Sequence, residues 1–121
     1  MNRNLSKLIV VCGAACFIAC TAPKKAETEK LSERMARSEM KRFPEPWMIE
    51  KARKPRWGYT HGLVVKSMLE ECKHTGDSTY YDYAKIYADS LIDADGRIKT
   101  MKYLSFNIDN VNGGKILFDL Y

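Results

Sequence analysis

The sequence has 121 residues, a formal net charge of +5 and four cysteines. Three of the cysteines fall within the first twenty residues, which leaves Cys72 alone and excludes a disulfide framework or a cysteine metal cluster in the fold. Lysines and arginines alternate with acidic residues after the apolar N-terminal region, so we expect a solvated helix face and no nucleic-acid partner.

Residues 1–19 have the features of a lipoprotein signal peptide. Arg3 and Lys7 precede an apolar run of twelve residues, which is shorter than the ~20 residues needed to span a bilayer. The segment FIAC resembles a bacterial lipobox, whose cysteine, here Cys20, is lipidated and attaches the protein to a membrane. We therefore expect a lipid-anchored protein of the bacterial cell envelope, in the periplasm or at the cell surface, with secretion as the alternative. The polar residues 20–30 are predicted to form a tether.

Helical periodicity organises the middle of the chain. Apolar residues at helical spacing predict a helix over 31–43, which two prolines end. After a long loop, a second helix is expected from about Gly62 to Thr75, with Cys72 as a small buried apolar residue on its stripe. Gly76 is placed to close this helix in the left-handed conformation. A third helix over about 78–91 then completes an antiparallel hairpin.

The C-terminal part of the chain is less regular. The segment DADG predicts a turn, and RIKTMKYLSF is expected to be a short extended piece or an irregular loop. A fourth helix is expected to begin near Asn112, and it carries no closing signal. We therefore predict an all-α protein and expect the chain to be the opening part of a larger one.

Two patterns suggest metal binding and do not complete a metal site. Asp93 and Asp95 precede a glycine as in a calcium loop, but the twelfth position of that loop is Leu104 where a glutamate is needed. His61 and His74 have no carboxylate at a spacing that would complete a site. We expect a structural turn, a structural His74 in the last turn of the second helix, and no metal.

Aromatic residues gather before the second helix. Two roles are open for Trp57, Tyr59 and His61: they bind a sugar ring, or they pack in the core under the loop. Their spacing does not decide between these roles. Asp109, in a short polar run, is by itself either a loop residue or a helix cap.

The segments RWGYTHG, TGDSTYYDYAKIYADSLIDADGRI and IDNVNGGKILFDLY together resemble the unsaturated rhamnogalacturonyl hydrolases. These enzymes form glycoside hydrolase family 105 and are related to the unsaturated glucuronyl hydrolases of family 88. The resemblance covers residues 31–121 and implies the N-terminal portion of a catalytic domain with an (α/α)6 barrel fold. On this basis the chain supplies three helices and the start of a fourth, and the fragment alone would be inactive.

The resemblance also implies a reaction and its residues. These enzymes hydrate the double bond of a terminal 4,5-unsaturated uronic acid on oligosaccharides derived from pectin (rhamnogalacturonan), and they use no cofactor or metal. Asp109 matches a supporting catalytic carboxylate, and Tyr59 matches a tyrosine that lines the sugar site. Trp57 and His61 are further candidates for substrate binding, while the principal acid–base residue is expected beyond Tyr121. The alternatives are a helical-hairpin module that binds a glycan or a protein, and another α/α-barrel glycosidase or polysaccharide lyase.

Overall fold

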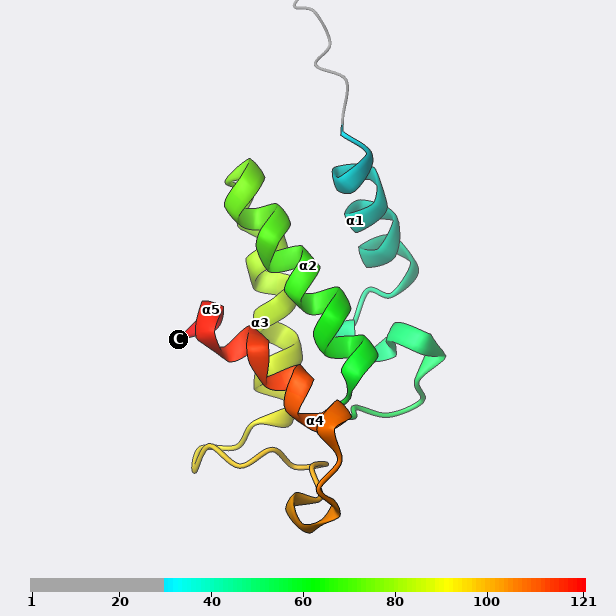
Figure 1. Cartoon of the computed structure of the whole chain (residues 1–121). Helices are drawn as coiled ribbons and strands as arrows, with labels where there is room; N and C mark the ends of the chain where they lie inside the picture. The colour runs from blue at the N-terminus through cyan, green and yellow to red at the C-terminus, as the bar shows by residue number, and fades with distance from the viewer. Residues whose placement is uncertain (1–29) are drawn as a thin grey trace, which may run out of the picture.

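The computed structural model describes residues 30–121, and these residues form a helical assembly (Figure 1). The predicted signal peptide, the lipidation site Cys20 and nearly all of the tether lie outside the described residues. The elements in chain order are α1 (Leu31–Arg42), η1 (Pro46–Lys51), α2 (Tyr59–Thr75), α3 (Thr79–Leu91), η2 (Tyr103–Ser105), α4 (Ile108–Asn112), η3 (Gly113–Ile116) and α5 (Leu117–Leu120).

The predicted all-α fold class is confirmed. Residues 30–121 contain no strand, and the nearest feature to one is an isolated antiparallel bridge between Ile92 and Ile98. The arrangement is consistent with the N-terminal part of an all-α barrel. Within this described part, none of the helices has both the length and the apolar composition needed to cross a membrane.

Helix α1 lies against the α2–α3 hairpin through a small apolar contact. It ends at Arg42, as the two following prolines predict. Its Ala36 and Met40 pack on a second apolar cluster, formed by Met68, Tyr80 and Tyr83. The Tyr83 hydroxyl of α3 donates a hydrogen bond to the carbonyl of Phe43 at 2.7 Å, which fixes the end of α1.

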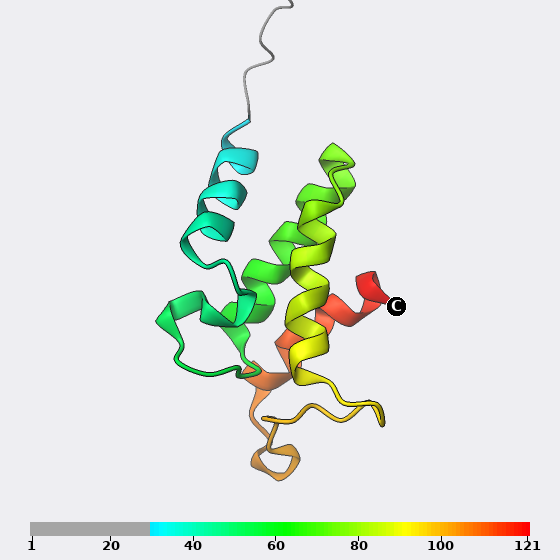
Figure 2. The same cartoon turned by 180° about the vertical axis from the view of Figure 1, so that it is seen from behind.

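Helices α2 and α3 form the predicted antiparallel hairpin, and the two opposite views show them running side by side (Figures 1 and 2). Gly76 has φ 75°, and its N–H donates to the carbonyl of Cys72, so the predicted left-handed C-cap is confirmed. The Asp77 carboxylate accepts a hydrogen bond from the N–H of Thr79 at 3.0 Å and caps the start of α3. Cys72 packs against the cluster of Met68, Tyr80 and Tyr83 as an apolar residue, but it is only partly buried, which is less than predicted.

The start of α2 differs from the prediction. The helix begins at Tyr59, before the predicted start at Gly62, and the N–H of Gly62 already donates to the carbonyl of Gly58. Glycine is unfavourable inside a helix by about 1 kcal/mol relative to alanine, so Gly62 suggested a boundary. Gly62 lies inside the helix because the backbone of Gly113 packs directly against it.

The segment between α3 and α4 contains the predicted turn. The Asp93 carboxylate accepts hydrogen bonds from the N–H groups of Asp95 and Arg97, and Gly96 has φ 76°. The Asp93 carboxylate therefore stabilises the turn in which it lies. Residues 30–121 contain no group of three or more potential metal ligands.

The C-terminal helical run starts earlier than predicted. Helix α4 begins at Ile108, and the Asn107 side chain caps it by accepting a hydrogen bond from the N–H of Asp109 at 3.0 Å. The expected start near Asn112 is therefore wrong. Gly113 has helical φ and ψ of −57° and −28°, so the chain continues through it into η3 and α5.

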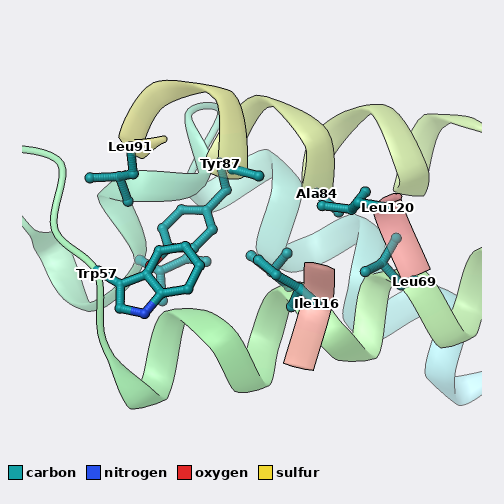
Figure 3. Packing of buried hydrophobic residues seen from close by; sticks show 10 residues of the cluster. Trp57, Leu69, Ala84, Tyr87, Leu91, Ile116 and Leu120 are labelled. Carbon is teal, nitrogen blue, oxygen red and sulfur yellow. The ribbon is translucent and has the colours of Figure 1, made fainter. Parts of the chain in front are cut away.

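The main hydrophobic core lies where the C-terminal run crosses the α2–α3 hairpin (Figure 3). Ile116 and Leu120 enter between the two helices, where they are 0% and 6% exposed. Full burial of such side chains is worth roughly 1.5–3 kcal/mol each. The other buried members of the cluster are Ile49, Trp57, Val65, Leu69, Ala84, Tyr87, Ala88 and Leu91.

Candidate functional site

The two segments that carry Tyr59 and Asp109 lie side by side. Tyr59 is the first residue of α2, and Asp109 is in the first turn of α4. One turn further along each segment, a Cβ atom added to Gly62 would lie 2.5 Å from the Cα of Gly113. Only a residue without a side chain permits so close an approach of two backbones. The two glycines therefore bring the start of α2 and the C-terminal helical run into direct contact.

Both predicted residues on these segments are accessible. Tyr59 is 49% exposed, and Asp109 is also exposed. Asp109 uses its backbone N–H for the Asn107 cap, which leaves its carboxylate out of the capping interaction. A carboxylate in the first turn of a helix lies in the favourable field of the helix dipole.

Trp57 lies below this surface and is only 5% exposed. Its indole Nε1 donates a hydrogen bond to the carbonyl oxygen of Asn110 at 2.8 Å. Its backbone N–H donates to the Thr100 hydroxyl at 2.8 Å. The indole also borders Gly113, because a Cβ atom there would lie 2.8 Å from Nε1. Trp57 thus contacts the helix that carries Asp109 from the inside.

His61 is completely buried. Its Nε2 lies 3.1 Å from the carbonyl oxygen of Trp47, and since that partner only accepts, Nε2 carries the hydrogen. Nδ1 has no hydrogen-bond partner. Burial lowers the pKa of His61, and the positive charge of Arg56 acts in the same direction, so the imidazole is neutral near pH 7.

Tyr87 of α3 links these two buried rings, and sequence reasoning missed its role. Trp57 stacks on it with ring centroids 5.7 Å apart, and His61 stacks on it at 5.6 Å. Figure 3 shows the Trp57 and Tyr87 rings lying face to face between α2 and α3. The Tyr87 hydroxyl donates to the carbonyl of Arg56 at 3.0 Å. Its helical spacing indicated only a core position, because its ring partners, Trp57 in a loop and His61 in the first turn of α2, are distant in the sequence.

A strained loop segment lies next to the start of α2. Glu50 and Lys51 have φ values of 61° and 56°, which are unusual for residues with side chains. The Thr60 hydroxyl and the Arg56 guanidinium lower the pKa of the Glu50 carboxyl. The Arg56–Glu50 ion pair joins the two ends of this loop. No pattern in the sequence indicated the positive φ values of this loop or the Arg56–Glu50 ion pair.

An ionic cluster holds α5 on α2. Asp119 accepts hydrogen bonds from Lys66 and from Lys73, the latter at 2.6 Å, and these bonds lower its pKa. Glu70 lies between the two lysines and pairs with both. The spacing of Lys66, Glu70 and Lys73 indicates ion pairs along one face of α2. It does not indicate Asp119 as a partner, because Asp119 is distant in the sequence.

An open apolar hollow of about 580 Å³ flanks the C-terminal helical run. It is lined by Ile108, Val111, Asn112, Gly114, Lys115 and Phe118. Neither Tyr59 nor Asp109 is among the residues that line this hollow.

Residues 31–121 match the sequence model of the family described as Glycosyl Hydrolase Family 88. No solved structure matches the chain.

Proposed function

This chain belongs to glycosyl hydrolase family 88, and on this premise we propose that it serves to hydrolyse oligosaccharides ending in a 4,5-unsaturated uronic acid. The match supports a glycosidase of the family-88 type. We further propose the rhamnogalacturonan type of substrate, derived from pectin, because RWGYTHG, TGDSTYYDYAKIYADSLIDADGRI and IDNVNGGKILFDLY resemble the hydrolases that act on it.

The proposed reaction adds water across the C4=C5 double bond. A proton is delivered to C4 and water adds at C5, which gives a hemiketal that opens and releases the next sugar. One positioned carboxyl group can act as acid and then as base when its pKa lies near the working pH. In this proposal Asp109 is the supporting carboxylate beside that principal group. The negative charge of this supporting carboxylate would raise the pKa of the principal group.

The observation that carries the proposal is that Asp109 and Tyr59 are both exposed on segments in direct backbone contact. A carboxylate and an aromatic ring at one end of a rigid helix pair can hold one sugar together. Trp57 and His61 are buried, and this burial gives no support to the prediction that their side chains contact the substrate.

The test uses protein expressed from the complete gene and an unsaturated rhamnogalacturonan disaccharide, whose double bond absorbs in the ultraviolet. We expect absorbance to fall with wild-type protein, and Asp109→Asn to slow this by roughly 10²-fold or more, the scale of a positioned acid–base group. Asp95→Asn is the matched control, because Asp95 is exposed in the turn after α3. Sugar binding without any loss of absorbance would instead support a binding module.

The same experiment separates the substrate types. An unsaturated glucuronyl disaccharide from a glycosaminoglycan is compared with the rhamnogalacturonan disaccharide under identical conditions. Faster loss of absorbance with the glucuronyl substrate would overturn the pectin assignment and leave the reaction type standing.

A further inference from the structure

We propose that Trp57 is a positioning residue, which sets the place of Asp109 relative to Tyr59 without touching the sugar. This inference rests on the proposed function for the roles of Asp109 and Tyr59. It differs from the sequence-based expectation, in which Trp57 binds substrate directly.

The first observation is the hydrogen bond between the Trp57 side chain and α4. Indole Nε1 donates to the carbonyl oxygen of Asn110, the residue that follows Asp109. Helix α4 has only five residues, so its own hydrogen bonds cannot fix its position. A bond from a buried side chain holds it from outside, one peptide unit away from the catalytic candidate.

The second observation is that Trp57 is itself held on several sides. Its ring stacks on Tyr87, and its backbone N–H bonds to the Thr100 hydroxyl. Tyr87 also donates to the carbonyl of Arg56, the residue just before Trp57. A donor held in this way has little freedom, so the position of the Asn110 carbonyl is determined by the core.

The third observation is that the same short segment leads to Tyr59. Only Gly58, in extended conformation, separates Trp57 from the first residue of α2. On the other side, Gly113 contacts both the indole and Gly62 of α2. Trp57 therefore connects the two accessible residues through one rigid set of contacts. Positioning errors of about 1 Å can lower catalytic rates by roughly 10²-fold.

The test removes the indole N–H and keeps the ring. The residue 3-benzothienylalanine is incorporated at position 57, which replaces the N–H by sulfur, and Trp57→Phe serves as a second variant. We expect kcat on the unsaturated disaccharide to fall by about tenfold while KM changes less than about twofold. A direct sugar contact that binds ground state and transition state equally would instead raise KM and leave kcat unchanged. That result would overturn the inference.

A double-mutant cycle tests whether Trp57 acts through Asp109. In the Asp109→Asn background, the benzothienyl substitution should change kcat by less than about twofold. The matched control is the same substitution at Trp47, which packs against the core and whose backbone carbonyl bonds His61. Additive effects of the position 57 and Asp109 changes would overturn the inference.

A spectroscopic readout does not depend on the substrate. Asn110 and Val111 form the single Asn–Val pair of these 121 residues, so carbonyl-labelled asparagine with amide-labelled valine reports their shared peptide unit. The signal should move when the indole N–H is lost, because that N–H donates to this carbonyl. An unmoved signal overturns the positioning role. A moved signal in a protein that hydrolyses no unsaturated disaccharide keeps the contact and overturns the proposed function.

Discussion

Gly62 of α2 and Gly113 lie so close together that a Cβ atom on Gly62 would be 2.5 Å from the Cα of Gly113. Two opposing effects act on Gly62→Ala. Alanine favours the helix by about 1 kcal/mol, whereas a forced backbone shift in a packed core costs typically 1–3 kcal/mol. The contact is with backbone, which cannot rotate away, so the steric effect decides.

We therefore expect Gly62→Ala to lower the free energy of unfolding by up to about 2 kcal/mol, measured by urea denaturation of the complete protein. Gly114→Ala is the matched control, since nothing lies within 4 Å of a Cβ atom placed there. That variant should be neutral or slightly more stable. Equal stability of the two alanine variants would contradict the close packing of α2 on η3.

His61 predicts a loss of stability on mild acidification. Its pKa is lowered in the folded protein by burial, with Arg56 adding to the effect, while the hydrogen bond to the Trp47 carbonyl and the charge of Glu50 oppose it. The unfolded chain therefore takes up a proton first as the pH falls below about 6.5, so stability is full above that pH and declines below it. We expect the Tm difference between wild type and His61→Phe to change between pH 7 and 5. A constant difference would mean that the imidazole titrates normally.

Asp119 predicts a second change at lower pH. Hydrogen bonds from Lys66 and Lys73 lower its pKa, so its contribution to stability is present above about pH 3.9 and is lost as the pH falls further. Asp119→Asn should lower Tm at neutral pH and reduce the loss of stability on strong acidification. Salt should weaken the wild-type advantage, because both lysines are partly exposed. Insensitivity of Tm to Asp119→Asn would show that apolar packing alone holds α5.

The exposed apolar side chains predict the behaviour of isolated residues 30–121. Leu104, Phe106 and Phe118 are each about 90% exposed, at 88%, 90% and 90%. Extensive exposed apolar surface is uncommon on soluble monomers. The isolated segment should bind a hydrophobic dye and lack a cooperative thermal transition, and Phe106→Ser with Phe118→Ser should reduce dye binding. A sharp monomeric transition without dye binding would favour the small-module alternative.

Lipidation at Cys20 is predicted from the short apolar run and the FIAC segment. Labelled palmitate should enter the product in a bacterial host, and Cys20→Ser should abolish the incorporation. Cys16→Ser is the matched control, because it changes a neighbouring cysteine of the same apolar run. Palmitate incorporation that persists in Cys20→Ser would contradict lipidation at Cys20 and favour the alternative of a secreted protein.

The sequence predicted those parts of the fold whose signals are local. Helix α1, the α2–α3 hairpin and the Gly76 cap follow from periodicity, proline and glycine, and the structure confirms them. The starts of α2 and α4 were misplaced for one shared reason. Gly62 and Gly113 suggested helix boundaries by their propensity, whereas the structure uses them for a long-range contact.

The candidate site was only partly predictable, because it too depends on contacts between residues that are distant in the sequence. Tyr59 and Asp109 lie on accessible surface, which agrees with roles proposed from the resemblance without testing them. The burial of Trp57 and His61 depends on Tyr87, which is twenty-six or more residues away in the chain. No local pattern around Trp57 and His61 encodes contacts over this separation, so these aromatic residues alone left sugar binding and packing open.

The unbroken run from α4 through η3 to α5 constrains the number of residues between Asp109 and Ile116. Asp109 faces solvent at its start, while Ile116 and Leu120 are buried at its end. Each residue inserted into a helix turns everything beyond it by about 100°. A single insertion or deletion between Asp109 and Ile116 would therefore turn Asp109 by about 100° relative to Ile116, so that either the carboxylate changes direction or Ile116 leaves its place between α2 and α3. Related sequences should keep the length of this interval as well as Gly113, and accept substitutions at its exposed positions.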